Sequence, residues 1–325
     1  MHWLVTGGAG FIGSNLAIYL LAHGHRVTAF DNFSTGTIDN IQRVEKVGGD
    51  QFRYITGDIR SNSELKGIFN DVDCVVHLAA QVSVPRSVAD PSENDEINIW
   101  GFENVLNRAV NANVRTFIYA SSCAIYGNNS NLPLAEKAAP NPLSPYAKSK
   151  LMNEKIAHRF AEKYPKTKVV GLRFFNIYGA WQGFSGGYAS VIPKWIHCLM
   201  TDQQPILYGD GTATRDFCFV DEISKIILGI HLKPESVRST IYNIGAGQPI
   251  ELLHLFSVIS HVIQLKGKYI KFSAPKFLEP RKGDILHSLA DISRARNELG
   301  FTPSIKLEVG IEKILDNQYF ALEVG

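Results

Sequence analysis

Short apolar runs alternate with amphipathic stretches through the first half of the chain. The runs fit buried strands, and the stretches between them carry apolar residues at helical spacing. Strands that alternate with helices form parallel βαβ units joined by right-handed crossovers. The pattern therefore predicts an α/β fold with a doubly wound parallel sheet of Rossmann type. Strands are expected at 3–6, 26–30, 52–56, 74–78, 116–121 and 168–173, and helices at 12–23, 63–69, 96–111 and 145–164.

The pattern becomes irregular in the second half. Prolines interrupt a mixture of helix and loop, so we expect 176–325 to form mainly a smaller mixed α/β unit for a substrate, without a core of its own. Residues 1–175 would form the cofactor domain. A helix at 221–230 and a strand at 240–244 follow in the chain, and we expect the stretch of about 213–247 to return to the first sheet.

Composition and charge narrow the class of protein. Of the 325 residues, 45% are hydrophobic and 20% charged, which is typical of a globular protein. A net charge of +2 gives no reason to expect nucleic acid as a partner. No apolar run approaches the roughly 20 residues that cross a bilayer, so no membrane is expected. The four cysteines lack metal-ligand spacing, and no secretion signal is visible, so we expect no metal and a cytoplasmic location.

A glycine loop joins the first expected strand to the first helix. Gly7, Gly10 and Gly13 allow a tight turn and a close approach of a pyrophosphate to the helix amides. Asp31 ends the next strand, where a carboxylate can accept hydrogen bonds from an adenosine ribose and repel a 2′-phosphate. No Lys or Arg occurs in 32–36. The loop favours NAD over NADP as cofactor, with a structural turn and a surface Asp as the alternative.

Two further strand ends lie where such a cofactor would cross the sheet. Asp58 follows the third expected strand, where its carboxylate or the neighbouring amide could reach the adenine, although an ordinary turn also uses Asp. The segment 77–81 ends the fourth strand with small residues that leave room for a flat ligand. His77 by itself is expected to be a hydrogen-bonded core histidine.

A helix start follows the fifth expected strand, which ends in hydroxyl groups at 121–122. Ser144 can cap this helix, and the proline after it suits the first helical position. Tyr146 and Lys150 then lie one turn apart on one face. An ammonium beside a phenol is expected to lower the pKa of the phenol. Such a tyrosine can act as a general base toward a sugar hydroxyl, with a purely structural helix face as the alternative.

The order of these motifs resembles the extended short-chain dehydrogenase/reductases, and among them the nucleotide-sugar 4-epimerases. The resemblance implies that Tyr146 is the catalytic base, that Lys150 is its electrostatic partner, and that Ser122 is the catalytic hydroxyl, with Ser121 as an alternative. The matching pieces cover nearly the whole chain: 6–13, 58, 77–80, 98, 122–127, 146–150, 173–179, 215–217 and 281–284.

The resemblance also implies the residues that contact each ligand. For NAD these are Gly7, Gly10, Phe11, Ile12, Gly13, Asp31, Asn32, Ser34, Gly36, Asp58, Ile59, Leu78, Ala79, Ala80, Gln81, Asn98, Tyr146, Lys150 and Phe174. For a UDP-sugar they are Ser83, Arg86, Ser122, Tyr146, Asn176, Ala189, Val191, Tyr208, Arg215, Arg281, Asp284 and Ser288. The two arginines at 215 and 281 would bind the diphosphate, because a guanidinium forms bidentate bonds with phosphate oxygens.

The residue at 288 bears on the choice of sugar. Related epimerases narrow the sugar pocket there with a bulky ring, whereas Ser288 leaves space for a 2-acetamido group. The resemblance thus favours 4-epimerisation of UDP-N-acetylglucosamine and UDP-N-acetylgalactosamine. Arg86 could equally meet a uronate carboxylate, so UDP-glucuronate remains an alternative substrate, as do UDP-glucose and UDP-galactose.

Two other reactions and one other class of protein are less favoured. Cys123 and Ala124 stand where related dehydratases carry an Asp-Glu pair, which disfavours elimination and decarboxylation. A non-catalytic NAD-binding regulator or scaffold on the same fold would be expected to lack part of the Ser-Tyr-Lys set. The resemblance finally suggests a homodimer through the helices near 96–111 and 145–164.

Overall fold

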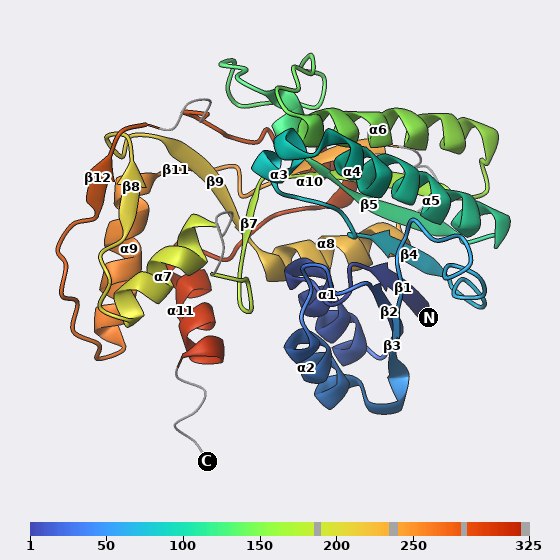
Figure 1. The fold of residues 1–325 in the computed structure, drawn as a ribbon, viewed down its shortest axis with the longest axis horizontal. Helices are drawn as coiled ribbons and strands as arrows, with labels where there is room; N and C mark the ends of the chain where they lie inside the picture. The colour runs from blue at the N-terminus through green and yellow to red at the C-terminus, as the bar shows by residue number, and fades with distance from the viewer. Residues whose placement is uncertain (185–189, 234–239, 281–284, 320–325) are drawn as a thin grey trace.

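A seven-stranded parallel sheet forms the centre of the protein. The computed structural model describes residues 1–184, 190–233, 240–280 and 285–319 (Figure 1). The sheet has the order β10-β6-β5-β4-β1-β2-β3. Its strands are β1 His2–Thr6, β2 Arg26–Asp31, β3 Phe52–Thr56, β4 Cys74–His77, β5 Thr116–Ser122, β6 Lys168–Phe174 and β10 Thr240–Ile244. The strand order reverses between β1 and β4, and ligands of such sheets bind at the carboxyl edge near this point.

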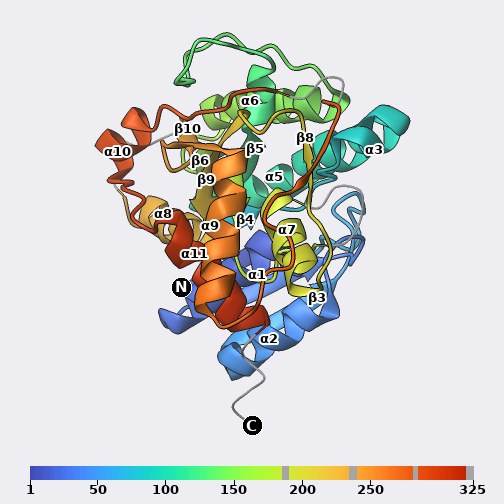
Figure 2. The same cartoon turned by 90° about the vertical axis from the view of Figure 1, so that its left-hand side faces the viewer.

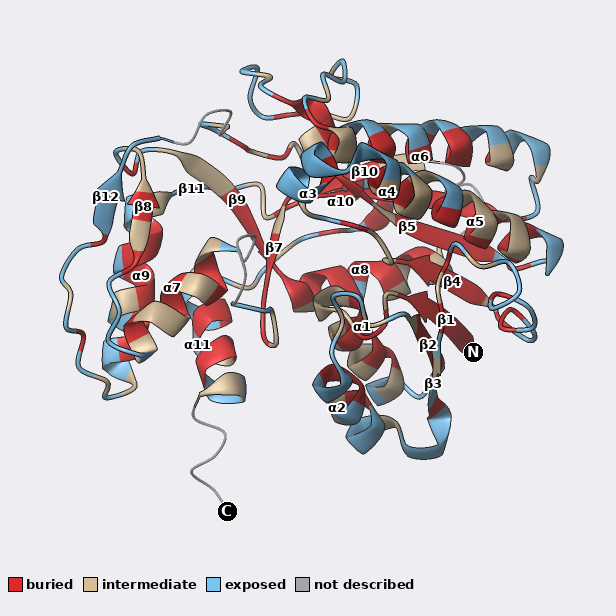
Figure 3. Ribbon diagram, viewed as in Figure 1, coloured by how far each residue is buried: buried red, intermediate tan, exposed pale blue. Residues whose placement is uncertain are grey.

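Helices cover both faces of the sheet. One face packs against α1 Phe11–Ala22 and α8 Val220–Leu232, with α2 Ile38–Gly48 beside α1 (Figure 1). The other face packs against α5 Phe102–Asn111 and α6 Pro145–Lys163, with the short helices α3 Val84–Ala89 and α4 Pro91–Asp95 at one end. Successive residues of a strand alternate between these two cores. The central strands are accordingly buried along their length (Figure 3).

The second half of the chain builds two small sheets. One has the order β11-β9-β7 and the other pairs β12 with β8. Helices α7, α9 and α11 pack beside them (Figure 2). The bounds are β7 Asn176–Tyr178, α7 Val191–Met200, β8 Ile206–Tyr208, β9 Thr214–Phe219, β11 Pro249–Glu251, α9 Leu252–Leu265, β12 Lys276–Leu278, α10 Ser293–Leu299 and α11 Leu307–Gln318. Their buried residues continue the core under β1 and α8, so this half has no separate core.

Most of the expected elements are confirmed. All six expected strands are present within a residue or two. Strand β10 pairs with β6 in the first sheet, whereas β9, at the start of the expected return of about 213–247, lies in the three-stranded sheet. The helix expected at 63–69 is wrong, because the segment forms a series of turns in which Gly67 has a φ of +81°. The helix expected at 96–111 begins as a π-helical stretch, Glu96–Gly101, before α5. Helix α2 was missed, and the division at residue 175 stays a prediction.

The length and apolar character of a helix decide whether it can cross a bilayer. Among the residues that the structure describes, none of the helices combines the length and the apolar character that a bilayer-spanning helix needs.

Candidate active site

The glycine loop brings three strand ends into contact. Gly7 has a φ of +72°, and a Cβ there would lie 2.7 Å from the backbone nitrogen of Ala79, which follows β4. A Cβ on Gly13 would run into the carbonyl oxygen of Gly7. Gly36, after β2, is equally tight, since its Cβ would lie 2.7 Å from that of Ala9. Helix α1 begins at this loop without a side-chain cap, which leaves its first amides for an anion.

Asp31 supports the loop from the end of β2. Its carboxylate accepts hydrogen bonds from the amides of Ala9 (3.0 Å) and Phe33 (2.8 Å). Burial raises the pKa of this carboxyl, while the two amides act in the opposite direction. Each carboxylate oxygen can accept a second hydrogen bond, so the group remains able to bind ribose hydroxyls.

The carboxylate of Asp58 is engaged within the protein. Arg60 donates from Nε and Nη2 to its two oxygens at 3.0 and 2.7 Å, and Asn32 donates at 3.0 Å. The hydrogen bonds from Arg60 lower the pKa of Asp58 to about 2. Of the two expected routes to an adenine, this arrangement favours the neighbouring amide of Ile59 over the carboxylate.

Asn98 holds the loop after β4. Its Oδ1 accepts from the amide of Gln81 (2.8 Å), and its Nδ2 donates to the Gln81 carbonyl (2.9 Å) and to Ser149 Oγ (3.2 Å). Asn98 lies in the π-helical stretch, a geometry often found at functional sites. Asn98 therefore positions residues 78–81, and its expected contribution to cofactor binding would act through that loop.

His77 is a core histidine, as expected. Its ring is buried, and Nδ1 hydrogen-bonds Thr6 Oγ1 at 2.9 Å. Burial lowers the pKa of His77 to about 3, so the ring stays neutral.

The expected catalytic side chains meet at the carboxyl edge of the sheet. Ser122, the last residue of β5, accepts from the amide of Ala124 at 3.1 Å, and its hydroxyl lies close enough to the Tyr146 phenol to lower the pKa of that phenol. Lys150 is buried, donates to the carbonyl of Ala120 at 3.0 Å, and has its Nζ 5.9 Å from the centre of the Tyr146 ring. Helix α6 fixes these positions because Ser144 caps it, accepting from the Ala147 amide at 3.1 Å.

The pKa of Tyr146 is shifted upward, opposite to the expected lowering. Burial raises the pKa of Tyr146 to about 12, although the hydrogen bond from Ser122 lowers it. Burial also lowers the pKa of Lys150 to about 8. The loss of hydration of a buried phenolate outweighs the attraction of an ammonium at this separation. The spacing on the helix reveals that Tyr146 and Lys150 lie close together. It does not show whether burial or the attraction of the ammonium has the larger effect on the pKa of Tyr146.

The structure chooses between the two serines of β5. Ser121 donates to Glu154 Oε1 at 2.5 Å, inside a buried ion pair in which Arg173 Nη2 lies 2.8 Å from Glu154 Oε2. Neighbouring residues of a strand face opposite ways, so Ser122 faces Tyr146 instead. The alternative hydroxyl is thus structural.

Three side chains gather at the expected sugar end. Cys123 follows Ser122 and lies beside Ser288, which is buried and lowers the pKa of the Cys123 thiol. Burial raises the pKa of the Cys123 thiol to about 12, so it stays protonated. Arg215 on β9 donates from Nη1 to the carbonyls of Thr214 (2.8 Å) and Leu286 (3.1 Å). The contact between Cys123 and Ser288 joins segments far apart in the sequence, and no sequence pattern indicated it.

Arg86 lies on the surface near the start of α6. Ser83 caps α3 by accepting from the Arg86 amide at 3.1 Å. The Arg86 guanidinium forms a two-point ion pair with Glu93, at 2.5 and 2.8 Å. Arg86 thus has an ionic partner within the protein. This pairing argues against a role for Arg86 in binding the carboxylate of a uronate.

The remaining expected residues lie on the elements around this edge. Phe11 and Ile12 begin α1, and Ser34 lies in the loop after β2. Leu78 and Ala80 flank Ala79 after β4, Phe174 pairs with Ser122 across β6 and β5, Asn176 begins β7, Val191 begins α7 and Tyr208 ends β8. Ala189, Arg281 and Asp284 fall outside the described residues.

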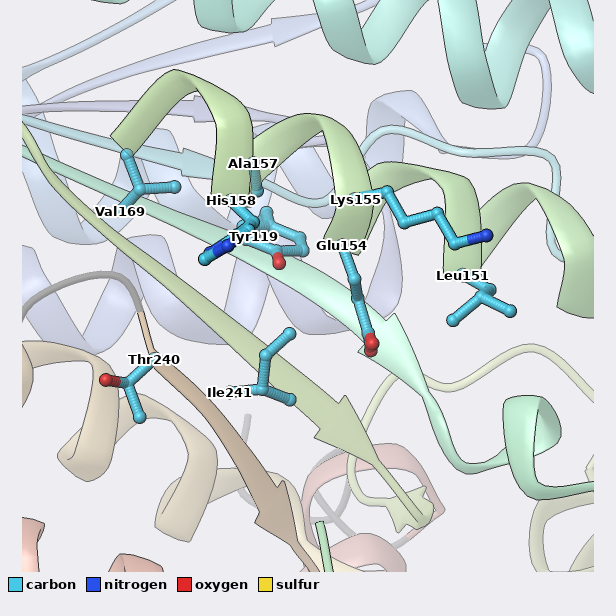
Figure 4. A pocket seen from close by; sticks show the side chains of 9 residues that line it. All are labelled: Tyr119, Leu151, Glu154, Lys155, Ala157, His158, Val169, Thr240 and Ile241. Carbon is cyan, nitrogen blue, oxygen red and sulfur yellow. The ribbon is translucent and has the colours of Figure 1, made fainter. Parts of the chain in front are cut away.

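A separate cavity of about 260 Å³ lies between α6, β6 and β10 (Figure 4). Its lining is Tyr119, Leu151, Glu154, Lys155, Ala157, His158, Val169, Thr240 and Ile241. None of these was an expected ligand contact, so the cavity is not part of the candidate active site.

Comparison with known proteins agrees with this geometry. A model of the NAD dependent epimerase/dehydratase family matches residues 3–245. The chain belongs to that family. A putative UDP-glucose 4-epimerase of Methanocaldococcus jannaschii is 34% identical over 96% of this chain and 97% of its own. UDP-glucuronate 4-epimerase 2 of Arabidopsis thaliana is 31% identical over 96% of this chain and 74% of its own.

Solved structures of epimerases superpose over almost the full length. A UDP-N-acetylglucosamine 4-epimerase of Methanobrevibacter ruminantium, in complex with UDP-N-acetylmuramic acid, has a TM-score of 0.88 at 34% identity, covering 97% of this chain and 98% of its own. The UDP-glucose 4-epimerase of Thermotoga maritima, with UDP-glucose, has a TM-score of 0.90 at 31% identity, covering 99% and 100%. The Thermus thermophilus UDP-glucose 4-epimerase, solved with NAD, reaches 0.84 at 30% identity, covering 98% of each chain.

The chain is therefore an NAD-dependent enzyme with the fold of the UDP-sugar 4-epimerases. The glycine loop fits NAD, because Gly7, Gly13 and Gly36 let the backbone of neighbouring segments pack closely around the uncapped first amides of α1, where a pyrophosphate would bind.

Proposed function

We propose that the protein is a UDP-sugar 4-epimerase that interconverts UDP-N-acetylglucosamine and UDP-N-acetylgalactosamine. The observation that carries the choice of sugar is the contact between Ser288 and Cys123, directly beside Ser122. Both side chains are small, so the wall next to the catalytic hydroxyl leaves room for a 2-acetamido group. The structure of Methanobrevibacter ruminantium, named as a UDP-N-acetylglucosamine 4-epimerase, supports this reading.

In this reaction Tyr146 takes the proton of the sugar O4 hydroxyl, with Ser122 hydrogen-bonded to both groups. NAD, held by the glycine loop and Asp31, would supply the redox chemistry, as acceptor and then donor of the hydride at C4 on opposite faces of the sugar. Tyr146 then gives the proton back to O4, so no atom is gained or lost. The Ser122 hydroxyl lies beside the Tyr146 phenol, where it can share this proton.

The raised pKa of Tyr146 sets a requirement on this step. A phenol with a pKa of about 12 needs added positive charge nearby before it can act as a base near neutral pH. Lys150, with a pKa of about 8, is mostly charged at pH 7. The nicotinamide of oxidised NAD is cationic, so we infer that the cofactor and Lys150 together activate Tyr146.

UDP-glucuronate and UDP-glucose or UDP-galactose are the alternative substrates. One relative is named as a putative UDP-glucose 4-epimerase and another as a UDP-glucuronate 4-epimerase, at 34% and 31% identity. The ion pair of Arg86 with Glu93 disfavours the uronate, and the small Ser288 admits the plain hexoses as well as the acetylated ones.

The test is a chromatographic or NMR assay of the purified protein with UDP-N-acetylglucosamine and no added NAD. Formation of UDP-N-acetylgalactosamine would establish the reaction and show that the cofactor is retained. A protein that contains NAD yet leaves UDP-N-acetylglucosamine unchanged would contradict the proposal. Parallel incubations with UDP-glucuronate and UDP-glucose would then identify the substrate.

We also infer a homodimer formed through α5 and α6. Trp100, just before α5, is 62% exposed, and Met152 on α6 is 38% exposed. Helix α6 packs against both α5 and the π-helical stretch that carries Trp100. Large exposed apolar side chains on adjacent helices are typical of a protein interface.

A further inference from the structure

The carboxylate of Asp216 is fully buried, and the proposed chemistry makes no use of it. It lies on β9 beside Arg215. Oδ1 accepts from the amide of Ala246 at 2.5 Å, and Oδ2 accepts from the amides of Gly247 and Ala290, both at 3.0 Å. One side chain thereby joins β9, the loop after β10 and the segment that carries Ser288.

The segment that carries Ser288 is held to β9 by two kinds of bond. Thr214 donates its amide to the carbonyl of Leu286 (2.9 Å) and accepts from the amide of Ser288 (3.2 Å). The next amide on that side, of Ala290, donates to the Asp216 carboxylate instead. The Asp216 carboxylate therefore takes the place of a backbone carbonyl as the next acceptor in the series of hydrogen bonds between β9 and the Ser288 segment. It does so where this segment leaves the proposed sugar pocket.

The packing around this carboxylate is tight. A Cβ on Gly245 would lie 2.7 Å from Asp216 Oδ2 and 3.0 Å from the Cβ of Ala290. Among the described residues, none forms an ion pair with Asp216, and its three amides are the interactions that offset its burial. A residue without acceptors at this position would leave these amides unpaired.

The same segment links the two ends of the proposed substrate site. Ser288 lies beside Cys123, next to the proposed catalytic Ser122, and the carbonyl of Leu286 accepts from Arg215. The separation between the catalytic hydroxyl and the arginine proposed for the diphosphate thus depends on where this segment lies.

We propose that Asp216 is a positioning residue for the UDP-sugar, which fixes the Ser288 segment against β9 so that Arg215 and Ser288 bind one substrate in register with Ser122. The inference rests on the proposed roles of Arg215 and Ser288. It concerns the binding of the substrate and not the activation of Tyr146 or the binding of NAD.

The first test is Asp216→Asn, which keeps the size of the side chain. The new NH2 group faces an amide donor, so at least one of the three hydrogen bonds is lost. We expect the KM for UDP-N-acetylglucosamine to rise at least about tenfold, while kcat stays within about threefold and the NAD content is unchanged. An unchanged KM in the folded variant would overturn the inference.

A matched control separates positioning from general loss of stability. Glu222 on α8 is also buried and accepts from the amides of Ser304 (2.9 Å) and Ile305 (3.1 Å), which are not proposed ligand contacts. Glu222→Gln should lower the melting temperature and leave the KM unchanged. The same rise of KM in both variants would contradict a specific role of Asp216.

Two further variants keep the test decisive. Gly245→Ala retains Asp216 but pushes on its carboxylate, so it should raise the KM in the same direction even if Asp216→Asn does not fold. Arg215→Ala tests the assignment on which the inference rests. If Arg215→Ala leaves the KM unchanged, the assignment fails. If Arg215→Ala raises it while Gly245→Ala and Asp216→Asn do not, only the role of Asp216 fails.

Discussion

At the scale of single residues, burial decides protonation in the candidate active site. Tyr146, Cys123 and His77 all keep their neutral forms near neutral pH, because an apolar surrounding disfavours charge. Lys150, in contrast, remains mostly charged at pH 7, with a pKa of about 8. The site therefore holds a neutral phenol that becomes a base when further positive charge is bound beside it.

Replacing Tyr146 with Phe tests the proposed base. The variant lacks the hydroxyl that exchanges the O4 proton, so we expect turnover to fall by about 10²–10⁴-fold. The fold and the amount of bound NAD should not change, as measured by circular dichroism and by release of the cofactor. Tyr54→Phe, at an exposed position on β3, serves as the control. Turnover by Tyr146→Phe at the rate of that control would exclude this role.

Replacing Ser288 with Tyr tests the selectivity of the sugar pocket. A ring at this buried position would fill the space proposed for the acetamido group. We expect the variant to lose activity on UDP-N-acetylglucosamine and to keep activity on UDP-glucose if the wild-type enzyme has it. Ser288→Ala removes the hydroxyl without adding volume and should keep the acetylated substrate. Equal losses for both sugars in Ser288→Tyr would show that the ring acts on the fold and not on selectivity.

The buried His77 makes stability depend on pH. Its pKa is about 3 in the folded protein and near 6.5 in an unfolded chain, so only the unfolded state binds the proton between these values. The free energy of unfolding should therefore fall as the pH drops below about 6.5, by up to about 1.4 kcal/mol per pH unit from this residue. His77→Asn, which can still bond Thr6, should show a shallower slope in urea unfolding between pH 7.5 and 5.5. Identical slopes would contradict this origin.

At the scale of elements, the start of α6 positions the catalytic pair. Ser144 caps the helix, and the amide of Tyr146 donates to Ser87 Oγ of α3 at 3.2 Å. Ser149 donates to the Tyr146 carbonyl at 2.8 Å and accepts from Asn98. The first turn of α6 is thus fixed by α3 and by the π-helical stretch, which also holds the loop after β4.

Removal of the helix cap should weaken this arrangement. Ser144→Ala leaves the Ala147 amide without its acceptor, so we expect the free energy of unfolding to fall by about 1 kcal/mol. Chemical denaturation would measure the loss. Ser144→Asp, which restores an acceptor, should recover most of it. If the Asp variant is no more stable than the Ala variant, the hydroxyl does not act as a cap.

At the scale of the whole molecule, the two halves of the chain share one core and enclose the site between them. The first sheet and its helix α6 supply Ser122, Tyr146 and the glycine loop, whereas β9 and the segment after residue 284 supply Arg215 and Ser288. The proposed dimer surface on α5 and α6 lies on the other side of the catalytic helix. Assembly and catalysis would therefore share α6.

The proposed dimer predicts an effect of a charge on its surface. Trp100→Glu places a carboxylate among apolar side chains and should shift the protein from dimer to monomer. Light scattering coupled to gel filtration would measure the mass. Tyr269→Glu, at an exposed position outside these helices, should leave the mass unchanged. A monomeric wild-type protein would contradict the dimer directly.

The sequence by itself determined the local features of this protein. Alternating apolar and amphipathic segments predicted the parallel sheet, because strands and helices differ in their hydrophobic period. The glycine spacing predicted the phosphate loop, and the helical repeat placed Tyr146 and Lys150 on one face. The same rules failed where local signals were weak, as in the turns at 63–69 and the missed helix α2.

The tertiary structure alone decided contacts between distant segments. It turned Ser121 toward Glu154 and Ser122 toward Tyr146, brought Ser288 to Cys123, and placed the Asp216 carboxylate between three segments. It also reversed the expected direction of the Tyr146 pKa, because desolvation depends on everything packed around the ring. Periodicity describes neighbours along the chain, whereas burial and hydrogen bonding across the fold depend on residues that the chain brings together from far apart.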